Sequence, residues 1–241
     1  MNIPARMNLS GWRSDGRETV LPLNMFLLTK DILFPPVNLA NEDGLLAIGG
    51  DLSTERLLLA YRCGIFPWYN EGEPICWWSH DPRFVLFPHE LKISKSMHRI
   101  LKQDEFQFSI NKDFAAVIQS CKTITRKDQP GTWISPAVQE AYCRLHTLGH
   151  AHSAEAWMGE SLVGGLYGIR IGNVFFGESM FSTVPNASKF ALINYVQHLQ
   201  KDKVQLIDCR VYTRHLESLG ARMIPRANFI TLLDEAVGNK E

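Results

Sequence analysis

The sequence predicts an α+β fold in two domains. With 241 residues, the chain can bury a sizeable core as one large domain or two modest ones. Three strand patterns between residues 150 and 179 are joined by two-residue links, which predicts an antiparallel meander. A helix and then strand, helix and strand patterns follow. This order is typical of one sheet that carries helices on its faces.

Residues 1–81 are predicted to form a small N-terminal α/β domain with an irregular lead-in over residues 1–33. Ser53 is expected to cap a helix over residues 54–63, which Gly64 closes. The stretch "GIFPWYNEGEPICWWSHDPR" is rich in Trp, Pro and Gly and predicts rigid loops or short strands. The Pro-bearing "DPRFVLFP" reads as a connector and places the boundary near residue 82.

Residues 82–241 form the predicted second domain. Asn186 is expected to cap the helix after the meander, in which Phe190, Ile193 and Val196 have the spacing of a buried face. The other helices are expected over residues 92–102, 136–148, 213–219 and from about 227. The strands are expected over residues 150–158, 161–170, 173–179, 204–211 and 221–224.

Composition and short patterns argue against a strongly charged protein, a disulfide-rich protein and a membrane protein. Lys plus Arg and Asp plus Glu each number 25, so a polyanion would have to meet a local patch. The five cysteines form no C-x-x-C pair, which suits a reducing compartment better than a disulfide framework or zinc ribbon. No segment has the pattern of a signal peptide or the roughly 20 apolar residues of a membrane helix. We expect a cytoplasmic monomer with no membrane partner.

Two acidic residues lie in otherwise apolar stretches. Glu178 falls in "FFGESMF", and Asp208 ends the apolar run of "VQLID". A carboxylate taken out of water needs a partner, or its pKa rises until it neutralises. A structural alternative is that Glu178 caps a turn or pairs with an Arg, and that Asp208 caps the next helix. Two such acids at strand ends of one domain favour a functional site.

Basic residues gather on one face of the helix predicted over residues 92–102. Lys95, Arg99 and Lys102 fall within roughly 60° of each other at 100° per residue. Met97, Ile100 and Leu101 lie on the opposite side. The pattern is that of a solvated amphipathic face or, alternatively, of a surface that follows nucleic-acid phosphates.

Other candidate groups have weaker patterns. Trp68 and Trp133 lie in turn-rich segments, where an aromatic ring can line an apolar pocket or stack on a base, whereas most Trp residues belong to cores. His150 and His152 share a strand face, but no third ligand has zinc spacing. Cys209, beside Asp208, reads as a buried inert thiol rather than a nucleophile.

A set of ordered motifs covers most of the chain, from about Phe34 to about Phe229: "GLLAIGGDLS", "GIFPW", "WWS-DPR", "GTWI", "LHTLGHAHS-E-W", "LVGGLYG", "FFGESMFS", "NASK", "LIDC" and "SLGA--IPR". This set resembles the bacterial leucyl/phenylalanyl-tRNA–protein transferases. The resemblance implies that the second domain has an acetyltransferase-like (GNAT-type) fold.

The resemblance also implies a reaction. Leu or Phe, and Met less well, moves from its tRNA to the N-terminal amine of a protein beginning with Arg or Lys, which marks the product for N-end-rule degradation. The implied partners are aminoacyl-tRNA and those proteins, with no metal and no acyl-CoA. Glu178 and Asp208 correspond to polar residues of the reaction centre. The aminoacyl pocket and 3′-adenosine platform correspond to Trp68, Trp133, Tyr142, Leu166 and Phe175, and the acceptor-stem helix to Lys95, Arg99 and Lys102.

One position departs from the family motif. Asp208 and Cys209 are followed by Arg210, where the family has Gln. The Gln carbonyl would accept the proton of the attacking amine, but Arg is permanently protonated and has no acceptor. By strand alternation Arg210 is expected to pair with Asp208. Arg210 at this position has three interpretations: it inactivates the enzyme, it belongs to a variant in which Asp208 or water is the base, or it alters the choice of acceptor. A second departure is Thr213, where the family often has Asn.

Two alternative functions remain. An acyl-CoA-dependent N-acetyltransferase would need a Gly-bearing pyrophosphate loop at a helix N-terminus, and "VPNASKF" has no glycine. A tRNA-binding module with lost or weakened transfer is the other alternative, and Arg210 favours it.

Overall fold

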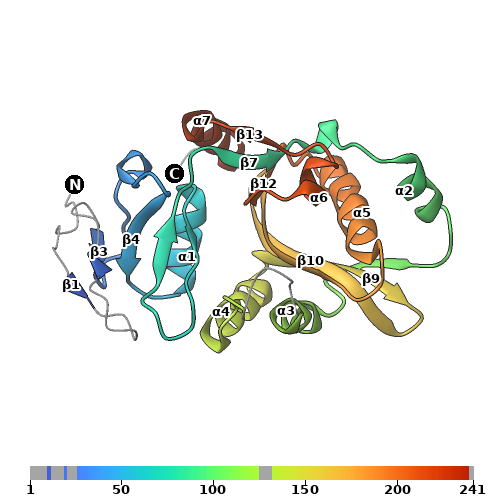
Figure 1. Ribbon diagram of the computed structural model, residues 1–241, viewed down its shortest axis with the longest axis horizontal. Helices are drawn as coiled ribbons and strands as arrows, with labels where there is room; N and C mark the ends of the chain where they lie inside the picture. Colours follow the sequence, from blue (N-terminus) through green and yellow to red (C-terminus); the bar gives the residue numbers. More distant parts are fainter. Residues whose placement is uncertain (1–9, 12–18, 21–25, 125–131, 239–241) are drawn as a thin grey trace. The chain divides into compact units, whose positions relative to one another are not determined.

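The computed structural model describes residues 10–11, 19–20, 26–124 and 132–238. The chain divides into two compact units, Met1–Asp81 and Pro82–Glu241. Both units combine sheet and helix (Figure 1), so the predicted α+β class is confirmed. Within the described ranges, no helix has the length and apolar character that crossing a membrane would require.

The first unit is built on a four-stranded sheet with the order β3-β4-β6-β5. These strands are β3 (Phe26–Leu28), β4 (Leu45–Gly49), β5 (Phe66–Pro67) and β6 (Cys76–Trp78). A separate two-stranded sheet pairs β1 (Ser10–Gly11) with β2 (Thr19–Val20). The predicted helix is present as α1 (Thr54–Arg62), and the Ser53 side chain accepts a hydrogen bond from the amide of Arg56 as expected. The short η1 (Val37–Leu39) precedes β4.

The second unit contains a seven-stranded sheet with the order β13-β7-β12-β11-β10-β9-β8. The strands are β7 (Arg83–Leu86), β8 (Gln107–Ile110), β9 (Ala151–Met158), β10 (Ser161–Ile171), β11 (Val174–Ser182), β12 (Leu206–Arg210) and β13 (Arg222–Ile224). The predicted meander β9-β10-β11 is confirmed as antiparallel. The pair β11–β12 is parallel, whereas the other neighbours are antiparallel.

Helices cover both faces of this sheet. In Figure 1, α5 lies on one side of β10 and α3 and α4 lie on the other. A Cβ at Gly164 would meet Ala187 of α5, whereas a Cβ at the next residue, Gly165, would approach Val117 of α3. Adjacent strand residues therefore face different helices. The helices are η2 (Pro88–Glu90), α2 (Lys95–Ile100), α3 (Phe114–Thr123), α4 (Pro136–Thr147), α5 (Ala187–Lys201), α6 (Arg214–Glu217) and α7 (Arg226–Val237).

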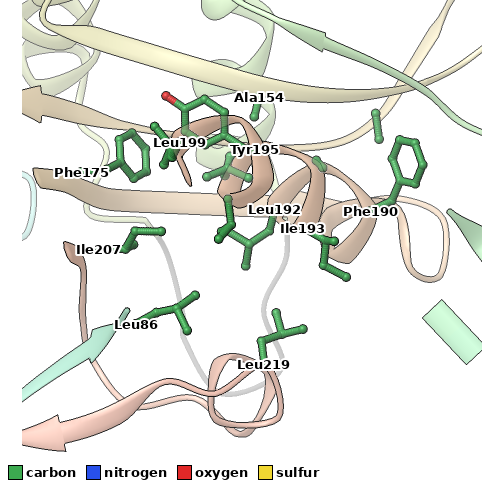
Figure 2. Packing of buried hydrophobic residues seen from close by; sticks show 14 of the residues in the cluster. Leu86, Ala154, Phe175, Phe190, Leu192, Ile193, Tyr195, Leu199, Ile207 and Leu219 are labelled. Atoms are coloured by element: carbon green, nitrogen blue, oxygen red, sulfur yellow. The ribbon is translucent and has the colours of Figure 1, made fainter. Parts of the chain in front are cut away.

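The α5 face of the sheet carries a continuous hydrophobic core. Figure 2 shows Leu192 and Ile193 of α5 among side chains from several strands. Phe175 of β11 meets Tyr195 edge to face, with ring centroids 5.0 Å apart. Both residues are nearly inaccessible to solvent. The core thus fixes β11 against α5 beside the point where β11 pairs with β12.

Several expectations about the elements were wrong. The segment read as a connector contains strand β7, whose four residues are all buried and which pairs with both β12 and β13. Helix α2 is shorter than predicted and ends before Lys102. Asn186 is the N-cap residue of α5 as predicted, but it has a left-handed conformation, with a φ of 69°, and its side chain makes no capping hydrogen bond. β8 and α3 had no counterpart among the predicted elements.

Candidate active site where two parallel strands separate

The parallel pairing of β11 and β12 stops early. It runs through Val174 with Leu206 and ends at Phe176 with Asp208, although β11 continues to Ser182. Each strand carries an irregularity just beyond this point. The register of β11 with β10 shifts at Glu178, and that of β12 with β7 shifts at Cys209. Glu178 therefore lies inside β11, whereas the sequence had suggested that it lies at the end of a strand.

Glu178 and Arg210 form an ion pair across this separation. Nη2 of Arg210 contacts Oε1 of Glu178, and the side chains are 7% and 0% exposed respectively. The sequence predicted that the side chain of Arg210 would pair with Asp208, and this was wrong. Arg210 has a φ of 60°, so the regular alternation of strand side chains fails at this residue.

Asp208 pairs instead with a residue that the sequence reasoning missed. Nε of Arg83 lies 3.2 Å from Oδ1 of Asp208, and both side chains are 1% exposed. The amide of Arg210 donates a hydrogen bond of 3.0 Å to the same oxygen. A charged residue in the apolar run "RFVL" was the signal that could have identified Arg83, because a buried Arg requires a partner.

Burial and nearby groups change the pKa values of Asp208 and Cys209. Burial raises the pKa of the Asp208 carboxyl, while the charge of Arg83 and the amide of Arg210 oppose that shift. Burial also raises the pKa of the Cys209 thiol, which disfavours the thiolate and agrees with an inert cysteine. The arrangement can hold a positive charge at Glu178, but the Arg210 guanidinium has no atom that can accept a proton from a substrate amine.

The residues expected to line a pocket are not all brought together. Leu166 and Phe175 belong to the core cluster on the α5 face. Tyr142 of α4 instead packs edge to face against Tyr167, with ring centroids 5.8 Å apart. Since Leu166 and Tyr167 are neighbours in β10, Tyr142 lies on the opposite face of the sheet from Leu166.

The two tryptophans differ in exposure. Trp133 is 8% exposed and lies just before α4. Trp68, in the first unit, is 39% exposed and its ring centroid lies 6.1 Å from that of Trp78. Trp68 therefore offers an accessible aromatic surface, whereas Trp133 is largely covered.

The three basic residues expected to meet the acceptor stem lie at the surface of the second unit. Lys95 and Arg99 belong to α2, and Lys102 follows in a turn; all three are exposed. Met97 on the other side of α2 is buried. The side chains thus present positive charge outward while the apolar side anchors the helix.

A third buried acid, Glu155 of β9, was also missed. It accepts hydrogen bonds from the hydroxyl groups of Ser109 and Ser153 and from the amides of Lys112 and Asp113. These donors lie on β8, on β9 and at the start of α3, so Glu155 ties these elements together. Because both carboxylate oxygens accept hydrogen bonds from the protein, we assign Glu155 a structural role.

The histidines do not assemble a metal site. Nδ1 of His146 lies 2.8 Å from the carbonyl oxygen of Ala151, and Nδ1 of His152 lies 3.0 Å from the side-chain nitrogen Nδ2 of Asn111. In the part of the chain that the structure describes, no group of three or more His, Cys, Asp or Glu residues is arranged to hold a metal ion.

Family models match both units. The model for leucyl/phenylalanyl-tRNA protein transferase matches residues 85–234, and the model for the N-terminal domain of the same proteins matches residues 50–81. Among solved structures, a GCN5-related N-acetyltransferase from Kribbella flavida is a distant neighbour. It has 12% identity and a TM-score of 0.36 over 70% of this chain and 59% of that chain.

Curated relatives are much closer in sequence. The leucyl/phenylalanyl-tRNA–protein transferase of Flavobacterium johnsoniae is 58% identical over 87% of this chain and 99% of its own length. That of Syntrophus aciditrophicus is 57% identical over 87% of this chain and 88% of its own length. That of Syntrophobacter fumaroxidans is 55% identical over 88% of this chain and 91% of its own length. The chain belongs to the leucyl/phenylalanyl-tRNA–protein transferase family.

Proposed function

We propose that this chain transfers Leu or Phe, and Met less well, from aminoacyl-tRNA to the N-terminal amine of proteins that begin with Arg or Lys. The observation that carries the proposal is the family match over residues 85–234, which includes Glu178 and Asp208. The products would be substrates of N-end-rule degradation. The protein would act in the cytoplasm as a monomer, without a metal or acyl-CoA.

The reaction is aminolysis of an activated ester, so positioning of the amine against the ester carbonyl supplies much of the acceleration. The apolar side chains of Leu166 and Phe175 contribute to the aminoacyl pocket. Selection by such a pocket discriminates one methylene by only about 1–3 kcal/mol, which is consistent with acceptance of more than one apolar amino acid. By the resemblance to the family, Trp133 and Tyr142 are assigned to substrate binding by the second unit, and Trp68 to substrate binding by the first unit.

Glu178 orients the positively charged groups of the substrates. Its side chain is buried and already paired with a guanidinium, so the site tolerates a cation at this carboxylate. Asp208 is fully buried and acts on the reaction through the main chain of Arg210. Arg210 has no proton acceptor, so we infer that transfer by this chain is weakened or directed to altered acceptors.

The tRNA is held through its phosphates. Lys95, Arg99 and Lys102 are exposed on one side of α2 and its following turn, and clustered positive charge is what backbone contact requires. We assign them to the acceptor stem. Residues 1–81 form the N-terminal domain and residues 82–241 the catalytic domain in this proposal.

A tRNA-binding module without transfer is the second candidate. The pairing of Arg210 with Glu178 favours it, because this ion pair occupies the carboxylate that would receive the substrate amine. Such a protein would bind aminoacyl-tRNA with strong salt dependence but would leave the ester intact.

The test is single-turnover transfer from labelled Leu-tRNA and Phe-tRNA to an Arg-initial peptide, with filter binding of the same tRNAs in parallel. Transfer by the wild-type chain supports the first proposal. Binding without transfer, together with transfer by Arg210→Gln, selects the second candidate for this chain. Absence of both transfer and binding overturns both.

A further inference from the structure

Arg83 is a buried charge that lies two residues from the domain boundary. Its side chain is 1% exposed, and its guanidinium carbon lies 4.5 Å from the centroid of the Phe229 ring. In the pairing of β7 with β12, Val85 is opposite Asp208. Because Arg83 and Val85 share a strand face, the guanidinium reaches Oδ1 of Asp208, 3.2 Å from Nε.

Asp208 connects Arg83 to the main chain of Arg210. Oδ1 of Asp208, which pairs with Nε of Arg83, also accepts a hydrogen bond of 3.0 Å from the backbone amide of Arg210. Arg210 has a φ of 60°, and the amide of Val211 donates a 2.7 Å hydrogen bond to the carbonyl oxygen of Cys209. This is a three-residue γ-turn with its central residue at positive φ, a strained conformation that persists only where neighbouring contacts hold it.

The turn decides where the side chain of residue 210 points. In a regular strand, residues 208 and 210 would face the same way. The turn at Arg210 breaks that alternation and directs its guanidinium to Glu178 on β11. A contiguous set of contacts therefore runs from Arg83 through Asp208 and the turn to Glu178.

We propose that Arg83 is a positioning residue. Through Asp208 it holds the turn at residue 210 and so sets the orientation of the side chain at that position toward Glu178. The inference rests on the proposed function only for its effect on transfer, since the contacts themselves are independent of substrate.

Charge makes Arg83 necessary for this arrangement. Without it, the buried Asp208 carboxylate would lose its ion-pair partner, and burial would drive it toward the protonated form. A protonated carboxyl is a weaker acceptor for the amide of Arg210. The charged groups around Asp208 are Arg83 from β7 and Arg210 from its own strand, with Glu178 of β11 beyond Arg210. The positive charge of Arg226 of α7 acts on Arg83.

The experiment uses the full chain and the variants Arg83→Met, Arg83→Lys and Arg83→Met/Asp208→Asn. The double variant removes both charges, while the Asn oxygen remains as an acceptor for the turn. Arg170→Met is the control, because Arg170 forms a partly exposed ion pair with Asp202 elsewhere in the same unit. The readouts are amide hydrogen exchange at Arg210 and Val211, and the pH profile of single-turnover transfer.

In Arg83→Met we expect exchange at these two amides to be at least about tenfold faster. We also expect the acid limb of the pH profile to move to higher pH, because loss of the cation raises the pKa of Asp208. The maximal single-turnover rate should fall, while the concentration of aminoacyl-tRNA that gives half of that rate should stay nearly constant. Arg83→Lys should restore part of the rate, and the double variant should restore protection of the two amides.

A purely structural role would lower thermal stability but leave these readouts unchanged. Unaltered exchange at both amides and an unaltered pH profile in Arg83→Met would overturn the proposal. Should Arg83→Met not fold, Arg83→Lys and the double variant decide the question by the same readouts. The exchange measurement does not require activity, so a wild-type chain that fails to transfer would refute the proposed function and leave the test of Arg83 intact.

Discussion

The guanidinium of Arg210 contacts the carboxylate of Glu178 immediately beyond the last paired residues of β11 and β12. Both side chains are buried, so each charge compensates the other in a place where neither can be solvated. A substrate amine that binds Glu178 must therefore compete with a guanidinium already in place. This competition is set by residue 210 and can be altered by a single substitution.

Replacing Arg210 by Gln should increase transfer to an Arg-initial peptide. Gln frees Glu178 from its intramolecular cation and supplies a carbonyl oxygen that can accept a proton. General acid–base catalysis contributes about 10²–10⁴-fold, so an increase of about 10²-fold in the single-turnover rate is expected. Arg222→Gln is the control, since Arg222 pairs with Glu90 at the surface. Equal rates for wild type and Arg210→Gln would contradict the prediction.

Replacing Glu178 by Gln should destabilise the protein. The substitution leaves the buried guanidinium of Arg210 without its carboxylate, and breaking a buried ion pair from one side costs about 3–5 kcal/mol. The double variant Glu178→Gln/Arg210→Gln removes both charges. Its loss in free energy of unfolding should be much smaller than the sum of the losses in the two single variants. Urea denaturation measures the free energies of unfolding. Additive losses would show that the two residues are not coupled.

Elements held by local rules could be predicted from the sequence. The meander follows from alternating strand patterns and short links, and the helix after Ser53 follows from its cap. The amphipathic sides of α2 were also evident, because Met97 and the basic residues are separated by helical spacing. Each of these inferences depends on residues a few positions apart.

The centre of the candidate site depends on contacts between distant segments. Arg83 and Asp208 meet only because β7 inserts between β12 and β13, and the Pro-bearing sequence around β7 gave no sign of a central strand. The pairing of Arg210 was mispredicted because alternation assumes a regular strand, and the turn at positive φ violates that assumption. Tyr142 could not be placed by motif order, since helices on opposite faces have the same local pattern.

Gly168 should not tolerate a side chain. A Cβ at this position would lie 2.2 Å from the carbonyl oxygen of Phe176 and 2.4 Å from Cζ of Phe175. Because one neighbour is backbone, the strands must shift, and overpacking of this kind costs about 1–3 kcal/mol or more. Gly177→Ala is a matched control, since its nearest neighbour, the carbonyl oxygen of Asp208, is 3.5 Å away. Equal stability of Gly168→Ala and Gly177→Ala in urea denaturation would refute this prediction.

Neutralising the three basic residues of α2 and the turn that follows it should reduce the salt dependence of tRNA binding. Each phosphate contact contributes about 0.7–0.9 to the slope of log K against log salt. The triple variant Lys95→Gln/Arg99→Gln/Lys102→Gln should therefore lower the slope by about 2–3 and weaken binding at low salt. Lys201→Gln, which changes an exposed residue at the end of α5, is the control. Parallel slopes for the triple variant and wild type would exclude these residues from phosphate contact.

The contribution of Asp208 to the free energy of unfolding should decrease as the pH rises. Burial raises the pKa of its carboxyl above 3.8, so the folded protein holds this proton more tightly than the unfolded chain. The contribution to the free energy of unfolding is therefore present below the unfolded pKa and is lost as the pH rises through the folded pKa. Its slope cannot exceed about 1.4 kcal/mol per pH unit.

Asp202 supplies the opposite case for comparison, because its hydrogen bond with Arg170 lowers the pKa of its carboxyl. Its contribution is present above the unfolded pKa and is lost as the pH falls through the folded pKa. Urea denaturation at a series of pH values, for wild type, Asp208→Asn and Asp202→Asn, gives the two difference curves. We expect slopes of opposite sign. A curve for Asp208 that rises with pH would show that Arg83 and the amide of Arg210 outweigh the effect of burial, and that the carboxylate is the favoured form in the folded protein.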